Sequence, residues 1–338
     1  MGARGIAGTF NAAVAYFRAR PRLTHTIQAV LVAATLALCG WAVADQWSKA
    51  EPLLAHARPV PLVLALGFIA VYYLVFIFGW IRMLDAWGIR VPYRPALQAE
   101  MVSMLAKYLP GGVWTPAART VALRRSAGVT DTPTVLASIL VEAALSAVSG
   151  VIVFIVSLAW VNDVDAPLWA LIGFAVLLAL LLHPRIFRAV SEFVLRPFGA
   201  KIEPLPFGVM LILLVFYCAT WVLGGVAVYF MLRSLGADVP ISTIPYLGGV
   251  SAVGAIVAVV TVFLPSGLGA REASMYGLLL AVTSSGPALG VTIINRLAIT
   301  LVEVVLFGVG VLTWRGRGPA PSEEPPQEPE PSSARAHG

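Results

Sequence analysis

The sequence predicts an all-α protein that crosses a membrane several times. Hydrophobic residues make up 59% of the 338 residues, charged residues only 12%, and the mean hydropathy is +0.87. Because soluble domains carry about 25% charged residues, this composition is that of an integral membrane protein. The apolar residues are gathered in runs long enough for a helix to cross the hydrocarbon core, and basic residues stand at the ends of these runs.

Six full spans are expected, at residues 26–44, 60–83, 132–160, 168–182, 207–232 and 288–314. With both termini in the cytoplasm, the clusters of basic residues fall on the cytoplasmic side, as the positive-inside rule requires. We expect a basic cytoplasmic leader at 1–23, an integral membrane domain at 24–316 and a disordered Pro/Glu-rich tail at 317–338. The expected location is the inner (plasma) membrane.

The first apolar run, 26–44, has two interpretations. Residues 42–44 (AVA) resemble a signal-peptidase site, which would make the run a cleaved signal peptide. Because many spans follow, an uncleaved first helix is favoured. The second span, 60–83, is followed by Arg90 and Arg94, which place its end in the cytoplasm.

A broken helical unit follows the second span. Residues 99–109 have a helical pattern but are too few to cross a membrane, and 113–123 are helical again. Between them lie Pro110, Gly111 and Gly112, which break the helix because proline lacks the amide hydrogen and glycine permits unusual backbone angles. Basic residues at both ends favour a re-entrant hairpin that enters from the cytoplasm. A pair of amphipathic helices on the membrane surface is the alternative.

A second broken unit is predicted at 241–285, after the third, fourth and fifth spans. Its break is at 263–272 (FLPSGLGARE), where Pro265, Gly267 and Gly269 interrupt a long apolar run. Free backbone groups in hydrocarbon cost several kcal/mol each unless protein or water satisfies them. A break at this place therefore favours a site for a charged group.

Arg271 and Glu272 adjoin the second break. In one hypothesis Arg271 contacts a phosphate, beside the positive end of a helix that begins near Glu272. In the alternative, both are loop charges at the membrane surface. The same reasoning applies to Lys107 and Arg119, which flank the first break.

The last span contains Arg296 and Glu303, and each intramembrane charge costs at least ~2.5 kcal/mol. They are two helical turns apart on one face, with Thr300 between them. This pattern indicates either a polar stripe that lines a cavity or an arginine that pairs with a glutamate to hold two helices together. Glu142 in the third span, Glu272 and Glu303 are candidates for proton coupling or for compensation of the arginines.

The chain divides into two similar halves, 24–160 and 167–314. Each half has two spans, a broken unit and a closing span. Each break is followed by an arginine, and each closing span carries a glutamate. Three crossings are an odd number, so the halves would have opposite orientations in the bilayer, an inverted repeat of the kind found in alternating-access carriers. No extended identity links the halves, and the repeat stays a hypothesis.

No grouping of residues indicates catalysis or metal binding. The four histidines have no ligand spacing, both cysteines lie inside apolar runs, and neither a Ser/His/Asp set nor a phosphate loop occurs. We therefore expect no enzyme activity from this chain alone, no metal and no cofactor. The net charge of +6 does not indicate nucleic acid, because the basic residues flank apolar runs and meet anionic lipid there.

Residues 107–114 (KYLPGGVW) and 265–272 (PSGLGARE) resemble the two motifs of the flippase-like family named for the lysylphosphatidylglycerol synthase transmembrane region. The resemblance extends from the first span to the last and excludes the tail. It implies a polytopic inner-membrane protein that is linked to moving lipids between leaflets. In some members the module stands beside a soluble aminoacyl transferase domain, and other relatives accompany glycosyltransferases that use polyprenyl-phosphate carriers.

The predicted function is translocation of an anionic phospholipid or a polyprenyl-phosphate-linked lipid between leaflets. Lys107, Arg119, Arg271 and Arg296 are expected to bind the lipid headgroup. The alternative is a non-transporting membrane subunit that supports a separately encoded lipid or glycosyl transferase. The expected partners are thus anionic membrane lipids and, on the alternative, that transferase.

Overall fold

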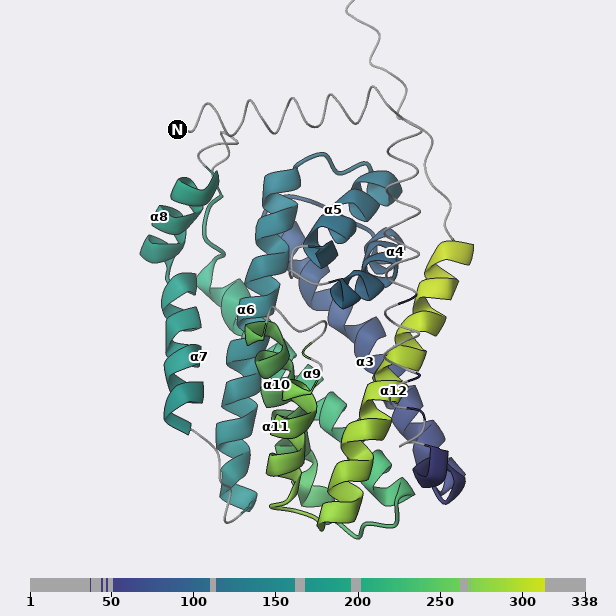
Figure 1. The fold of residues 1–338 in the computed structure, drawn as a ribbon. Coiled ribbons are helices and arrows are strands. Elements are labelled where there is room, and N and C mark those ends of the chain that lie inside the picture. The colour runs from purple at the N-terminus through teal and green to yellow at the C-terminus, as the bar shows by residue number, and fades with distance from the viewer. Residues whose placement is uncertain are drawn as a thin grey trace, which may run out of the picture.

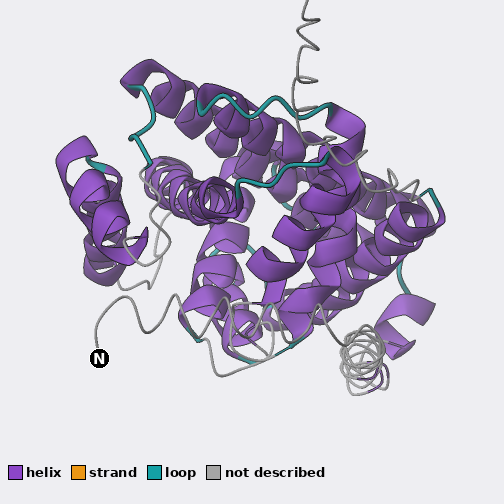
Figure 2. Cartoon of the chain, turned by 90° about the horizontal axis from the view of Figure 1, so that it is seen from above, coloured by secondary structure: helices purple, strands orange, loops and turns teal. Residues whose placement is uncertain are grey.

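The computed structural model describes residues 37, 44, 47, 51–109, 114–161, 168–195, 202–261, 267 and 269–313. All regular structure in these residues is helical (Figure 2). The helices, in chain order, are α3 (Pro59–Ala86), α4 (Tyr93–Ser103), η1 (Met104–Tyr108), α5 (Trp114–Ala127), α6 (Thr132–Ser157), η2 (Leu158–Trp160), α7 (Leu168–Leu182), α8 (Pro184–Leu195), α9 (Phe207–Ser234), η4 (Ile241–Thr243), α10 (Ile244–Val260), α11 (Ala270–Leu279) and α12 (Ser285–Leu312). The expected leader and tail, and most of the expected first span, lie outside the described residues.

The described residues contain five stretches long and apolar enough to cross a membrane, namely Pro59–Ala86, Thr132–Trp160, Phe207–Ser234, Ile241–Val260 and Ser285–Leu312. Four of them coincide with predicted spans, and the chain is an all-α polytopic membrane protein. The predicted fourth span coincides with α7, whose 15 residues extend about 22 Å, less than the hydrocarbon core of about 30 Å. Ile241–Val260, the predicted first arm of the second broken unit, is by length able to cross alone.

Both predicted broken units contain antiparallel helical pairs. The hydroxyl of Ser126, near the end of α5, donates to the carbonyl oxygen of Pro95 near the start of α4, at 3.2 Å. The hydroxyl of Tyr246, near the start of α10, donates to the carbonyl oxygen of Leu278 near the end of α11, at 2.8 Å. In each pair, the second helix therefore runs back toward the end of the molecule at which the first helix begins. The break residues Pro110, Gly111, Gly112 and Pro265 lie outside the described residues.

The two helical pairs lie at opposite ends of the molecule. In Figure 1, α4 and α5 occupy the upper part, α10 and α11 the lower part, and α12 runs from one end to the other. The side chain of Gln98 in α4 donates to the carbonyl oxygen of Thr313, just after α12, at 2.8 Å. An inverted repeat would give this arrangement, and the repeat itself stays a prediction.

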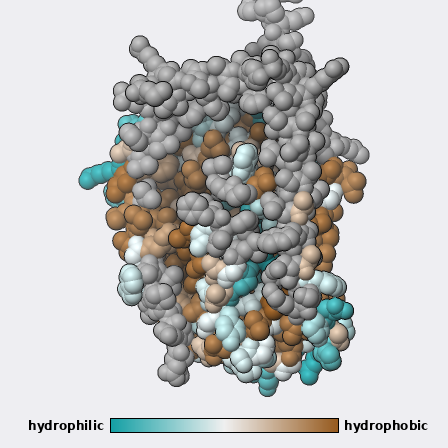
Figure 3. Space-filling view, in the orientation of Figure 1, coloured by the Kyte–Doolittle hydropathy of each residue, from teal (hydrophilic) through white to brown (hydrophobic). Residues whose placement is uncertain are grey.

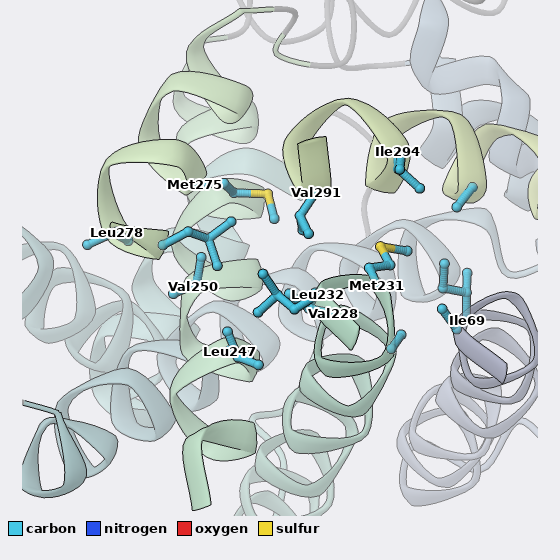
Figure 4. Packing of buried hydrophobic residues seen from close by; sticks show 14 of the residues in the cluster. Ile69, Val228, Met231, Leu232, Leu247, Val250, Met275, Leu278, Val291 and Ile294 are labelled. Atoms are coloured by element: carbon cyan, nitrogen blue, oxygen red, sulfur yellow. The ribbon is translucent and has the colours of Figure 1, made fainter. Parts of the chain in front are cut away.

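The main core lies where α3, α9, α10, α11 and α12 meet. Buried side chains from all five helices form one cluster there, including Ile69, Val228, Leu247, Met275 and Val291 (Figure 4). Large apolar side chains are also exposed on the outside of the helices, and Figure 3 shows such residues along both flanks. An apolar surface of this extent suits contact with lipid chains.

The backbones of α9 and α10 are in direct contact. A Cβ atom on Gly225 of α9 would lie 2.2 Å from the carbonyl oxygen of Ile244, and one on Gly248 of α10 would lie 2.4 Å from that of Trp221. Small residues allow helices in membranes to approach this closely. The contact fixes α10 against α9.

We predict that Gly225→Ala destabilises the protein by about 1–3 kcal/mol, because the added methyl group would collide with backbone atoms that cannot rotate away. The matched control is Gly224→Ala on the same helix, where a Cβ atom would meet nothing within 4 Å. Thermal unfolding of the purified protein in detergent measures both variants. Equal unfolding midpoints would contradict the backbone contact.

Candidate functional site

A buried arginine is held between two glutamates. Arg119 of α5 donates from Nη1 to Oε2 of Glu142 in α6 at 2.5 Å, and its Nη2 forms an ion pair with Glu100 of α4. The exposed fractions of the three side chains are 6%, 4% and 12%, respectively. We call these residues, together with Tyr217, the Arg119 cluster. Charge-assisted hydrogen bonds are the strong ones, so this cluster links α4, α5 and α6.

Two aromatic side chains complete the surroundings of the Arg119 cluster. The hydroxyl of Tyr217 in α9 donates to Oε1 of Glu142 at 3.2 Å. The guanidinium of Arg119 lies 4.7 Å from the ring centroid of Trp80 in α3, a cation–π contact. Trp80 is oriented in turn by its indole nitrogen, which donates to the hydroxyl of Ser138 at 2.8 Å.

A further glutamate, Glu303 of α12, is fully buried and accepts hydrogen bonds from two elements. Its Oε1 accepts from the ammonium of Lys107 in η1 and from the hydroxyl of Tyr73 in α3. The hydroxyl of Tyr108, next to Lys107, lies 2.7 Å from Oγ1 of Thr300, one turn before Glu303. These bonds hold the end of the first helical pair against α12.

The carboxylate of Glu272 joins the second helical pair to α12. Oε1 of Glu272 in the first turn of α11 accepts from Nη1 of Arg296 at 3.0 Å, and its Oε2 accepts from the backbone N–H of Gly269 at 2.7 Å. Glu272 thus caps α11 and anchors Arg296 with the same side chain. The cap residue Gly269 has φ +83° and Gly267 has φ +67°, a conformation that glycine adopts without strain.

Arg271 lies next to these groups and is partly buried. Its charge acts on Tyr72 and on Tyr73 and Lys107, the two hydrogen-bond donors to Oε1 of Glu303. Among the described residues, no carboxylate forms an ion pair with Arg271. We call Lys107, Arg271, Glu272, Arg296 and Glu303 the Arg271 cluster.

Neither cluster is electrically neutral when every group is ionised. In the Arg119 cluster, two carboxylates face one guanidinium, which leaves one negative charge in excess. In the Arg271 cluster, three cations face two carboxylates, which leaves one positive charge in excess. The ion pairs account for Lys107 and Arg296, so Arg271 carries the excess. An anion brought to this place would find a cation that the described carboxylates do not neutralise.

A cavity of about 400 Å³ adjoins the Arg119 cluster. Arg119 and Glu142 are the charged residues of its described lining, and most other lining side chains are apolar. Tyr72 borders the cavity, and the charges of Arg271 and Glu142 both act on that tyrosine. The cavity therefore has an apolar wall beside a charged one.

The structure separates the four predicted headgroup residues into two kinds. Lys107, Arg119 and Arg296 are engaged by carboxylates, whereas Arg271 is not engaged by any carboxylate of the described residues. Arg296 and Glu303 lie on one helix, as predicted, but each pairs with a different element rather than with the other. Each of these two ion pairs does join α12 to another helix.

Sequence reasoning missed two members of the Arg119 cluster, Glu100 and Tyr217, and two aromatic residues that contact the clusters, Tyr73 and Trp80. The signal for Glu100 was present, because a carboxylate in a helix at membrane depth is a functional candidate by default. The aromatic residues gave no such signal, since tyrosine and tryptophan are common at membrane interfaces and in cores.

We predict different costs for the loss of the two kinds of arginine. Arg119→Met should destabilise the protein by about 3–5 kcal/mol, because it leaves two buried carboxylates without their cation. Arg271→Met should cost about 1 kcal/mol or less, since no ion pair of the described residues is broken. Thermal unfolding in detergent distinguishes them, and equal losses would contradict the pairing described above.

Comparison with known proteins places the chain in a family. No curated protein matches the sequence. The family model described as "Lysylphosphatidylglycerol synthase TM region" matches residues 27–308, which include both helical pairs and every charged residue of the two clusters. The chain therefore belongs to the family of the lysylphosphatidylglycerol synthase transmembrane region.

Proposed function

We propose that the protein translocates an anionic phospholipid or a polyprenyl-phosphate-linked lipid between the two leaflets of the membrane. The observation that carries this proposal is Arg271, a partly buried cation of a membrane domain that pairs with no described carboxylate. An ionisable group at such a depth is costly and is a functional candidate by default. A phosphate is the common chemical group of the proposed lipids and would supply the missing negative charge.

The surroundings of Arg271 suit a phosphate in two further respects. Arg271 is the second residue of α11, where the positive end of the helix dipole favours an anion. Lys107 and Arg296 belong to the same cluster, and the charges of Arg271 and Arg296 both act on Lys107. The phosphate would contact Arg271, and the acyl or prenyl chains would stay in the surrounding lipid.

The position of the two helical pairs supports access from both sides. Lys107 comes from the pair at the upper end of Figure 1, and Arg271 from the pair at the lower end. In the proposed mechanism each pair closes the path to one leaflet, so a headgroup at Arg271 is reached alternately from either side. Related halves of opposite orientation would provide this motion, as they do in alternating-access carriers.

We propose further that the end with α4 and α5 faces the cytoplasm, with both termini there and the protein in the inner (plasma) membrane. Figure 1 shows α4, α5 and α8 at that end, and these helices carry Arg94, Arg124, Arg125, Arg185 and Arg188. Arg82, in the last turns of α3, and Arg90 lie at or next to the connection from α3 to α4. Arg58 and Arg233 are the described arginines near the opposite end. An excess of basic residues in short loops marks the cytoplasmic side.

A leaflet-exchange assay on purified protein in proteoliposomes tests the proposal. We expect the wild-type protein to exchange fluorescent phosphatidylglycerol, or a polyprenyl phosphate in the same assay, between leaflets. Arg271→Ala should reduce the rate by about 10- to 100-fold, because it removes a charge-assisted contact with the phosphate. Arg271→Lys should retain part of the rate, since the point charge remains while the two-pronged guanidinium is lost.

The matched control is Arg90→Ala, whose side chain is 92% exposed and should not affect exchange. An Arg271→Ala variant that exchanges lipid at the wild-type rate would refute the assignment of the site. Wild-type protein that exchanges none of a panel of phospholipids and polyprenyl phosphates would refute translocation. That result would favour the alternative of a membrane subunit that supports a separate transferase.

A further inference from the structure

The Arg119 cluster contains one carboxylate more than its cations require. Glu100 and Glu142 both contact the guanidinium of Arg119, and all three side chains are almost completely removed from solvent. Two carboxylates that share one buried site repel each other, and binding of a proton by one of them relieves the repulsion. The geometry therefore provides a place where a single proton can be held.

The groups that face these two carboxylates offer no second cation. Arg119 comes from α5, the hydroxyl of Tyr217 from α9, and Trp80 packs on the guanidinium from α3. From α7 and α10 the cavity beside Glu142 receives apolar side chains, namely Phe174, Leu178, Ala255, Ile256 and Val259. Lys107, which follows Glu100 along the chain, is bound to Glu303 of α12. Within the described part of the chain, Arg119 alone forms an ion pair with either carboxylate.

The excess negative charge of this cluster and the excess positive charge at Arg271 share one neighbour, Tyr72. The charges of Glu142 and Arg271 both act on Tyr72, which lies at the edge of the cavity. A phosphate bound to Arg271 would bring a further negative charge toward the glutamate pair, and nearby like charges favour the protonated form of a carboxylate. By linkage, a proton on the pair favours the bound phosphate to the same extent.

We propose that Glu100 and Glu142 form a proton-binding site and that the protein carries one proton together with each anionic lipid. This inference rests on the proposed function, and it adds the coupling ion. A carboxylate oxygen of the pair takes up the proton as the phosphate binds Arg271, and releases it on the other side as the lipid leaves. One negative lipid and one proton cross together, so no net charge moves through the low-dielectric centre.

The test uses proteoliposomes with a pH gradient and no membrane potential, the latter fixed by valinomycin and equal potassium concentrations. The probe is fluorescent phosphatidylglycerol. Because the protein would couple one proton to one lipid, a gradient of one pH unit should accumulate the probe about tenfold in the leaflet on the alkaline side. Movement of the probe should also acidify the compartment that receives it, as measured with a trapped pH dye.

Glu100→Gln and Glu142→Gln keep the shape of each side chain and remove its ability to gain a proton. We expect each variant still to exchange lipid toward an even distribution, without accumulation in the gradient. The control is Glu203→Gln, whose side chain is 76% exposed on the surface and should leave the accumulation at the wild-type level. Accumulation that persists in both cluster variants would overturn the proposal.

A measurement on the wild-type protein decides the matter if a variant does not fold. When short-chain phosphatidylglycerol is added to the protein in weakly buffered detergent, the protein should take up protons from the solution, up to one per lipid bound. Lipid exchange without accumulation or proton uptake would overturn the proton site and leave the proposed function standing. Absence of any lipid exchange by the wild-type protein would instead refute the proposed function.

Discussion

The arrangement of this protein depends on the pairing of buried charges between helices. A charge in the interior of a membrane protein is tolerated when a partner lies within hydrogen-bonding distance, and loss of one partner is costly. Here Arg119 pairs with Glu142, Lys107 with Glu303, and Arg296 with Glu272. Each pair joins a short helix to a long one. The same interactions therefore satisfy the charges and fix both helical pairs to the spans.

The second break shows how backbone groups are satisfied where an apolar helix ends inside the domain. Gly267 and Gly269 adopt positive φ angles, and Gly267 leaves no room for a side chain because a Cβ atom would lie 2.4 Å from Cα of Ala258. Glu272 accepts the N–H of Gly269 while it binds Arg296. The carboxylate of Glu272 thus stabilises both the backbone at the cap and the charge cluster. It fixes the first turn of α11, which carries Arg271.

Local sequence patterns predicted the helices well and their contacts poorly. The apolar run at 132–160 matches α6 with η2, and the proline–glycine motifs separate the arms of both helical pairs, because length, hydropathy and breaks are local properties. The partners of the charges are not local. Spacing placed Arg296 and Glu303 on one face, but the protein pairs them with residues of α11 and η1. Tyr217 carries no local signal and enters the site only through tertiary packing.

The contact between Gly225 and Gly248 limits how the protein can change shape. Two helices whose backbones touch cannot slide past each other, since any shift drives main-chain atoms together. Helices α9 and α10 thus form one rigid frame. Any motion that opens Arg271 to one leaflet has to occur around this frame, in α11 or at the contacts that α4 and α5 make with α12. Under the proposed function, the elements that move would be those that carry the ion pairs, so translocation of a lipid would exchange salt-bridge partners as well.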